Sequence, residues 1–174
     1  MATIKGGHKL KQYLAKLAAK LDQPGTLRVG WLENATAPNG DNLGLRAFRL
    51  EFGTSKMPPR PFFRNMIAAK SKEWPAALAL NLKQTDYNVK LTLERAGEGI
   101  KGQLKESIID LWAPPLSPVT IKKKGFEKPL IERGDMLNAV AWEVNMGGKV
   151  SLSAAGPGAA SFASAAKVAV KPKP

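Results

Sequence analysis

A proline-rich segment, Glu51–Arg64, constrains the fold of this chain more than any other stretch. Gly53 can adopt backbone conformations that are closed to other residues, while Pro58 and Pro59 fix φ and favour extended conformations in the residues before them. Pro61 suits the first position of a helix, where a missing N–H group costs nothing. The segment therefore predicts a stiff, extended arm that ends by starting a helix.

The side chains of this arm favour docking to another protein over catalysis. Arg60 and Arg64 flank Phe62 and Phe63, and arginine and aromatic residues are enriched among the anchors of protein interfaces. Single-stranded nucleic acid would stack on the same residue types, so that role stays open. Phe62 and Phe63 also stand at the start of an apolar helical stripe, and at least one of them is therefore expected in the core. The interface candidates in the arm are Glu51, Phe52, Gly53, Met57, Pro58, Pro59, Arg60, Pro61, Phe62, Phe63 and Arg64.

A second group of candidate contact residues lies in the C-terminal half of the chain. A proline-marked loop, Trp112–Leu116, is followed by Thr120, by the basic turn Lys122–Gly125 and by the segment Lys128–Leu137. The lysines either contact phosphate or an acidic partner, or form a plain exposed turn. They do not form a nucleotide-binding phosphate loop, because the leading glycines and the Ser/Thr are missing. The candidates here are Lys122, Lys123, Lys124, Pro129 and Leu130.

The order and spacing of these pieces resemble the tail-completion, or neck, proteins of long-tailed bacteriophages. The resemblance rests on Glu-Phe-Gly-Thr followed by Pro-Pro-Arg-Pro-Phe-Phe-Arg, and on Pro129-Leu130-Ile131 with Gly134 and Leu137 ahead of a predicted strand. It covers roughly residues 8 to 145.

The resemblance implies a structural virion protein at the head–tail junction, assembled in the host cytoplasm, with no enzymatic activity and no cofactor. It also implies a homo-oligomeric ring, commonly a hexamer, around the channel that DNA traverses. The partners would be the neighbouring connector and tail proteins, with transient non-specific DNA contact in the channel and no membrane.

The charge of the chain is strongly basic and unevenly distributed. The net charge is +13, with 14 Lys/Arg against 6 Asp/Glu in residues 1–87, 9 against 8 in residues 88–145, and 4 lysines without an acid in residues 146–174. Such a surface implies acidic partners, either nucleic acid or an acidic protein face, although a basic domain without a polyanion partner has the same composition. A basic nucleic-acid-binding module therefore stays open as the alternative function, although no complete recognition motif is present.

Length and composition predict one domain, residues 1–145, followed by an Ala/Ser/Gly-rich basic tail, residues 146–174. The tail contains little to bury, although Lys149–Ser153 and Lys167–Val170 have the pattern of short strands. The absence of cysteine excludes disulfides and thiolate metal sites. The sequence contains no run of about 18 apolar residues, so we expect no membrane span.

Hydrophobic spacing predicts an α+β fold in which a small, mostly antiparallel sheet packs against two long helices. We expect strands at 26–32 and 139–144, and long helices at 61–82, where Pro75 should kink or divide the helix, and at 88–111. Gly97, Gly99 and Gly102 weaken the second long helix, and they indicate close approach of another backbone or a need to flex.

Shorter elements complete the prediction. They are a helix at 8–21, a helical segment capped by Asp41 or Asn42 with Leu45, Phe48 and Phe52 on one face, a helical turn at 117–124 that Ser117 caps, and a turn near Asp135 to Asn138.

Residues that could carry chemistry are sparse, and each has a structural explanation. His8 is the only histidine and lies near the N-terminus, so a nucleophile–histidine site would depend on it alone. The pairs Glu94/Glu98 and Glu106/Asp110 have helical spacing but alternate with lysines and arginines, which is typical of a solvated helix face rather than of a glycosidase pair. The tryptophans Trp31, Trp74, Trp112 and Trp142 are expected to be core anchors.

Overall fold

The computed structural model of the chain describes residues 7–147, apart from residues 126 and 132. The predicted tail therefore lies outside the described residues, except for its first two positions, and so do the two strands expected within it. In the part of the chain that is described, no helix is long and apolar enough to cross a membrane.

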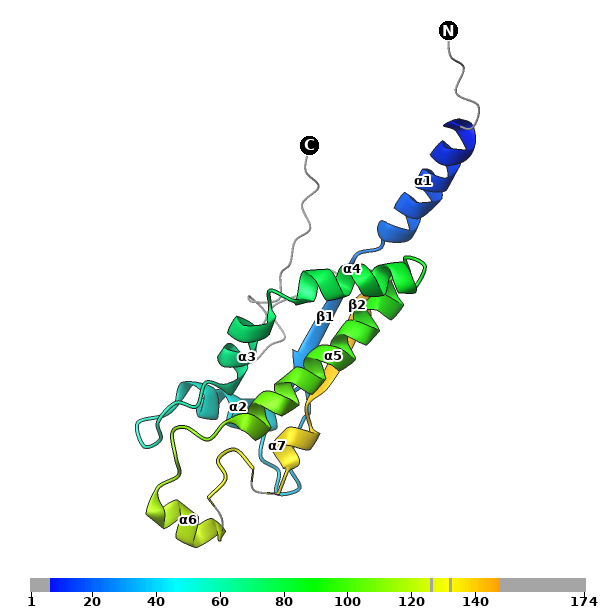
Figure 1. The fold of residues 1–174 in the computed structure, drawn as a ribbon. Coiled ribbons are helices and arrows are strands. Elements are labelled where there is room, and N and C mark those ends of the chain that lie inside the picture. Colours follow the sequence, from blue (N-terminus) through cyan, green and yellow to red (C-terminus); the bar gives the residue numbers. More distant parts are fainter. Residues whose placement is uncertain (1–6, 126, 132, 148–174) are drawn as a thin grey trace.

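A two-stranded antiparallel sheet and one long helix form the centre of the molecule, which confirms the predicted α+β class (Figure 1). Strand β1 (Gly25–Gly30) pairs with β2 (Ala141–Met146) in a register that places Leu27 opposite Val144 and Val29 opposite Trp142. Helix α5 (Val89–Asp110) packs on the face of the sheet that carries these apolar side chains. The residues that alternate with them, such as Arg28 and Glu143, are exposed.

Gly97 allows α5 to lie close to the sheet. A Cβ atom at this position would come within 2.9 Å of side-chain atoms of both Leu27 and Trp142. Added Cβ atoms at Gly99 and Gly102 would meet nothing within 4 Å. At Gly97 it is therefore side chains of the sheet, rather than another backbone, that come close to the helix, while Gly99 and Gly102 lie on its solvent side.

The first long helix of the prediction, 61–82, is divided into two helices near Pro75, as that residue indicated. Helix α3 (Phe62–Lys70) ends before a short turn, and α4 (Trp74–Gln84) begins with Pro75 in its first turn. Both helices pack against α5. Proline suits this position because the first N–H groups of a helix have no partner within the helix.

Two further helices begin at predicted capping residues. Helix α2 (Leu43–Phe52) is capped by Asn42, whose side-chain oxygen accepts a hydrogen bond from Leu45 N at 2.8 Å. Helix α6 (Pro118–Lys124) is capped by Ser117. The turn predicted near Asp135 is the short helix α7 (Asp135–Asn138).

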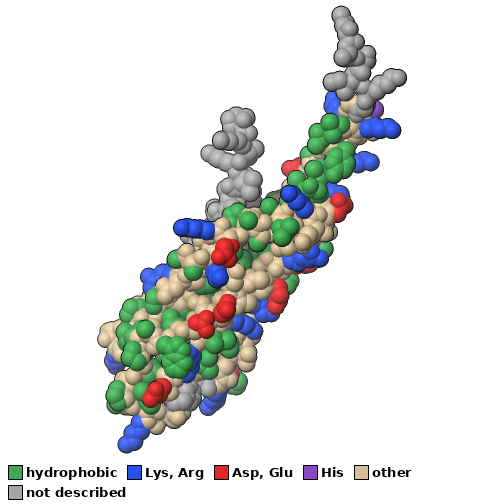
Figure 2. Space-filling view, viewed as in Figure 1, with side chains coloured by type: hydrophobic (Ala, Val, Ile, Leu, Met, Phe, Trp, Pro, Cys, Tyr) green, Lys and Arg blue, Asp and Glu red, His purple; other side chains and the backbone are tan. Residues whose placement is uncertain are grey.

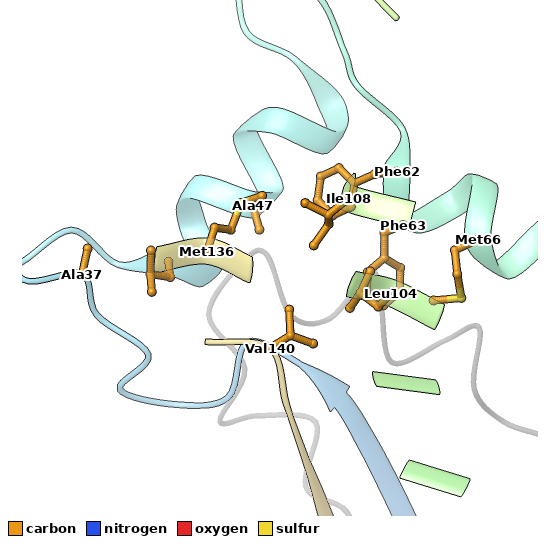
Figure 3. Packing of buried hydrophobic residues seen from close by; sticks show 10 residues of the cluster. Ala37, Ala47, Phe62, Phe63, Met66, Leu104, Ile108, Met136 and Val140 are labelled. Carbon is orange, nitrogen blue, oxygen red and sulfur yellow. The ribbon is translucent and has the colours of Figure 1, made fainter. Parts of the chain in front are cut away.

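The core lies where α2, α3, α5, α7 and the start of β2 meet, and Figure 3 shows its side chains converging from these elements. Phe62, Leu104 and Ile108 are fully buried at its centre. The indole of Trp31 packs edge-on against Phe62 and donates a hydrogen bond to Met136 O at 2.8 Å. Its buried apolar members are Ala37, Leu43, Ala47, Phe62, Phe63, Met66, Leu104, Ile108, Met136 and Val140.

Two helices project from this body at opposite ends. Helix α1 (Gly7–Leu21) leads away beyond α4, and α6 lies at the far end of the molecule (Figure 1). Neither helix contains a buried residue. The ends of the molecule therefore present surfaces that the core does not use.

Candidate functional site

Glu51, in the last turn of α2, is a buried carboxylate that caps the next helix. Its side chain is fully buried and accepts hydrogen bonds from Phe63 N at 2.9 Å and Arg64 N at 3.2 Å, in the first turn of α3. Arg64 Nε completes the arrangement at 2.8 Å from Oε1. The carboxylate thus satisfies N–H groups that the helix leaves without a partner, and its negative charge lies at the positive end of the helix dipole.

Gly53 then turns the chain back on itself. Its φ of 77° is in the left-handed region, and a Cβ atom would lie 2.8 Å from both Met57 O and Pro59 N. Thr54 and Met57 exchange backbone hydrogen bonds at 2.8 and 3.2 Å, which closes a tight turn. This corrects the predicted extended arm, because the segment after Gly53 is a loop that folds back.

Arg60 is buried where this loop returns to α2. Its backbone N–H donates to Leu50 O at 2.8 Å, its side chain donates to Pro115 O at 3.3 Å, and the residue is 4% exposed. Nε has no hydrogen-bond partner, and burial lowers the pKa of the guanidinium. Arg60 therefore joins the Glu51–Arg64 segment to the proline loop, two regions that the sequence marked separately.

The structure places five of the predicted interface residues in the interior, where no partner can reach them in this conformation: Glu51, Arg60, Phe62, Phe63 and Pro129. Their role is corrected to packing and capping. The expectation of a phenylalanine in the core holds for both Phe62 and Phe63. The other candidates are exposed or partly exposed, and their binding role stays a prediction: Phe52, Gly53, Met57, Pro58, Pro59, Pro61, Arg64, Lys122, Lys123, Lys124 and Leu130.

An aromatic patch, which we define as Leu45, Phe48, Phe52 and Arg64, lies on the outer side of α2 and α3. The rings of Phe48 and Phe52 are 4.7 Å apart, and the Arg64 guanidinium lies 4.8 Å from the centre of the Phe52 ring. Leu45 and Phe52 are exposed, whereas the buried side of α2 carries Leu43, Ala47 and Glu51. A shallow surface depression lined by Phe52–Pro59 adjoins this patch.

Trp112 corrects the expectation that all four tryptophans are core anchors. It is 61% exposed, and the Lys128 ammonium lies 3.7 Å from the centre of its ring. The indoles of Trp74 and Trp142 are partly buried and donate hydrogen bonds to Gln103 and Glu98, at 2.9 and 2.7 Å. Trp112 instead belongs to the surface at the α6 end of the molecule, where Val119 is also exposed.

In the first of the two carboxylate pairs of α5, both Glu94 and Glu98 contact neighbouring side chains. Glu98 accepts from Trp142 and pairs with Lys101 at 3.0 Å, and these two contacts lower the pKa of Glu98. Glu94 lies 3.8 Å from Lys90. His8 is exposed on α1, with Gln12 at 3.1 Å from its ring. Among the residues that the structure describes, no three His, Asp or Glu side chains are grouped to hold a metal ion.

Comparisons of the chain with models of protein families, with curated proteins and with solved structures found no match.

Proposed function

We propose that this chain is a structural virion protein at the phage head–tail junction, which completes the tail and docks it to the connector as a ring around the DNA channel. A protein that joins two structures needs a separate binding surface for each of them. The observation that carries the proposal is the pair of projecting helices, α1 and α6, at opposite ends of one body (Figure 1). The resemblance of Glu51–Arg64 and of the Lys128–Leu137 segment to neck proteins is the reason for proposing the head–tail junction as the site of assembly.

The charge distribution supports the same proposal. Figure 2 shows lysine and arginine side chains along the visible face from one end of the molecule to the other. A ring that lets DNA slide through its channel benefits from weak, sequence-independent attraction to phosphate. The basic groups would also match acidic faces of neighbouring virion proteins.

The aromatic patch is the proposed subunit contact of the ring. It combines two exposed apolar side chains, Leu45 and Phe52, with Arg64, whose guanidinium is already positioned by Glu51. Arginine and aromatic residues are enriched among the side chains that contribute most to binding at interfaces, and the contact with Glu51 already restricts the Arg64 side chain.

A basic nucleic-acid-binding module is the second candidate, favoured by the net charge of +13. Size-exclusion chromatography with light scattering, with and without duplex DNA, separates the two. We expect a discrete ring without DNA, and we expect Phe52→Ser to dissociate it while Leu80→Ser, at an exposed apolar residue of α4 outside the patch, does not. A monomer that changes size only when DNA is added would contradict the neck proposal and support the module.

A further inference from the structure

Helix α1 exposes an apolar stripe that the rest of the described chain does not cover. Leu10, Tyr13 and Leu14 are each more than half exposed, Leu21 is 42% exposed, and no residue of the helix is buried. Figure 2 shows hydrophobic side chains gathered along this projecting helix. An isolated helix of this length is marginally stable in water, so an uncovered stripe of this kind indicates a binding surface.

The base of α1 is attached to the body, while the rest of the helix leads away from it. Lys20 forms an ion pair with the Asp86 carboxylate and donates to Asp86 O at 3.1 Å, which holds the last turn of α1 against the turn between α4 and α5. From this point the helix continues outward (Figure 1). The body therefore leaves the stripe uncovered.

The charges of α1 indicate what that molecule must offer. The helix contains Lys9, Lys11, Lys16 and Lys20 and no acidic residue. The four leucines 10, 14, 17 and 21 follow the 4–3–4 spacing of a coiled-coil seam, and Lys11 and Lys20 then flank this seam on its two sides. A second copy of α1 would therefore bring like charges together. The segment 148–174 has four lysines and no acid, so it carries the same sign.

We infer that α1 is a docking helix for a different protein, which receives it in an apolar groove with an acidic rim. The leucines would enter the groove, as amphipathic helices do in helix-binding proteins, and the lysines would pair with carboxylates along its edges. Charge complementarity of this kind accelerates association and selects against partners of the wrong sign. The inference goes beyond the proposed virion role and does not depend on it.

The probe for this inference is calmodulin loaded with Ca²⁺, an EF-hand protein whose Ca²⁺ form opens a methionine-rich groove for amphipathic helices. The full chain is titrated with it by calorimetry, and Ca²⁺-free calmodulin, whose groove is closed, is the control. We expect binding with a Kd of about 1–10 μM that requires Ca²⁺. Leu14→Asp should raise the Kd by about 30-fold or more, because it places a charge within the stripe.

Ala19→Asp is the matched control, since it makes the same charge change on the opposite side of the same helix and should alter the Kd by less than about threefold. Replacing Lys9, Lys11 and Lys16 together by glutamine should weaken binding by about tenfold, while Lys20 keeps its ion pair. Absence of Ca²⁺-dependent binding, or equal effects of Leu14→Asp and Ala19→Asp, would overturn the inference.

Two parallel measurements identify the other possible occupants of the stripe. Light scattering of the free chain would reveal a dimer that Leu14→Asp dissociates, which would assign the stripe to a second copy. Sedimentation with phosphatidylserine vesicles would reveal membrane binding that depends on Leu14. Either result would overturn the assignment to an acidic protein groove. We expect neither measurement to respond to the Leu14→Asp change.

Discussion

The Glu51–Arg64 segment and helix α1 both combine apolar and basic side chains, yet they behave oppositely in the structure. In Glu51–Arg64 the two phenylalanines at 62 and 63 enter the core, and Arg64 and the start of α3 bind the Glu51 carboxylate. In α1 no side chain is buried, and only its last turn is attached to the body. A buried carboxylate accounts for the difference, because it gives the basic and polar groups of the first region a partner within the chain.

This comparison separates residues that build the fold from residues that are left for binding. The part of the sequence with the most unusual composition is mainly structural, because its glycine, prolines and charges close a loop and cap a helix. Helix α1, whose amphipathic sequence is not unusual, is instead the region that stays exposed. The central claim is therefore that the body of this chain is complete in itself, whereas α1 is completed by another molecule.

The largest expected loss of stability is at Phe62, and it distinguishes the buried residues of the Glu51–Arg64 segment from its exposed ones. Phe62→Ala should lower the free energy of unfolding by about 3–5 kcal/mol, because Phe62 is fully buried at the centre of the core. Phe52→Ala, in the exposed aromatic patch, should lower the free energy of unfolding much less. Urea unfolding of both variants makes the comparison, and similar losses in the two would show that the patch belongs to the core.

A smaller effect is expected at the capping carboxylate. Glu51→Gln keeps the shape of the side chain but removes the charge and leaves an amide facing the N–H donors of α3. We therefore expect the free energy of unfolding to fall by about 2 kcal/mol. Glu33→Gln changes an exposed carboxylate and should not alter unfolding measurably. If the two variants unfold at the same urea concentration, Glu51 does not hold the loop and α3 together.

Alanine substitutions at Gly97 and Gly99 of α5 should change the free energy of unfolding in opposite directions. Gly97→Ala inserts a methyl group against Leu27 and Trp142 and should cost about 1 kcal/mol or more. Gly99→Ala enters open space on the same helix and should stabilise the chain by about 0.5–1 kcal/mol, because alanine favours helix. Thermal unfolding of both variants tests whether α5 lies this close to the sheet, and a loss in both would contradict the packing described.

Much of the architecture was predictable because local signals and tertiary structure agree. Asn42 and Ser117 start helices where capping residues were expected, Pro75 divides α3 from α4, and the glycine at 97 marks the contact of α5 with the sheet. The strands were found within two residues of their observed bounds, because alternating apolar residues face α5.

The predictions that were wrong concern which side of an element is buried. Helix α2 has apolar residues on two sides, and the sequence predicts one shared face for the larger ones, Leu45, Phe48 and Phe52, without showing that the opposite side, with Leu43 and Ala47, is the buried one. The buried side contains Glu51, and a carboxylate in a sequence looks like a surface residue until its donors are known. Arg60 was misplaced for the same reason, since its acceptor is a backbone carbonyl of Pro115, far along the chain.

The smallest expected effect concerns α1. Leu14→Ser removes an apolar side chain that is exposed in the free chain, so the free energy of unfolding should change by less than about 0.5 kcal/mol. The same substitution at Leu104, which is fully buried on α5, is the contrasting variant and should be strongly destabilising. A loss of more than 2 kcal/mol, on the order of a core substitution, for Leu14→Ser would show that α1 is covered within the chain.

Hydrogen exchange of the free, full-length chain tests the central claim most directly. We predict that the backbone amides of α1 exchange close to the rate of an unstructured peptide, because a helix of this length without a buried face opens readily. The amides of α5 around Leu104 should be the slowest to exchange. Protection of α1 equal to that of α5 in the free monomer would contradict the account, because α1 would then be part of the same cooperative body.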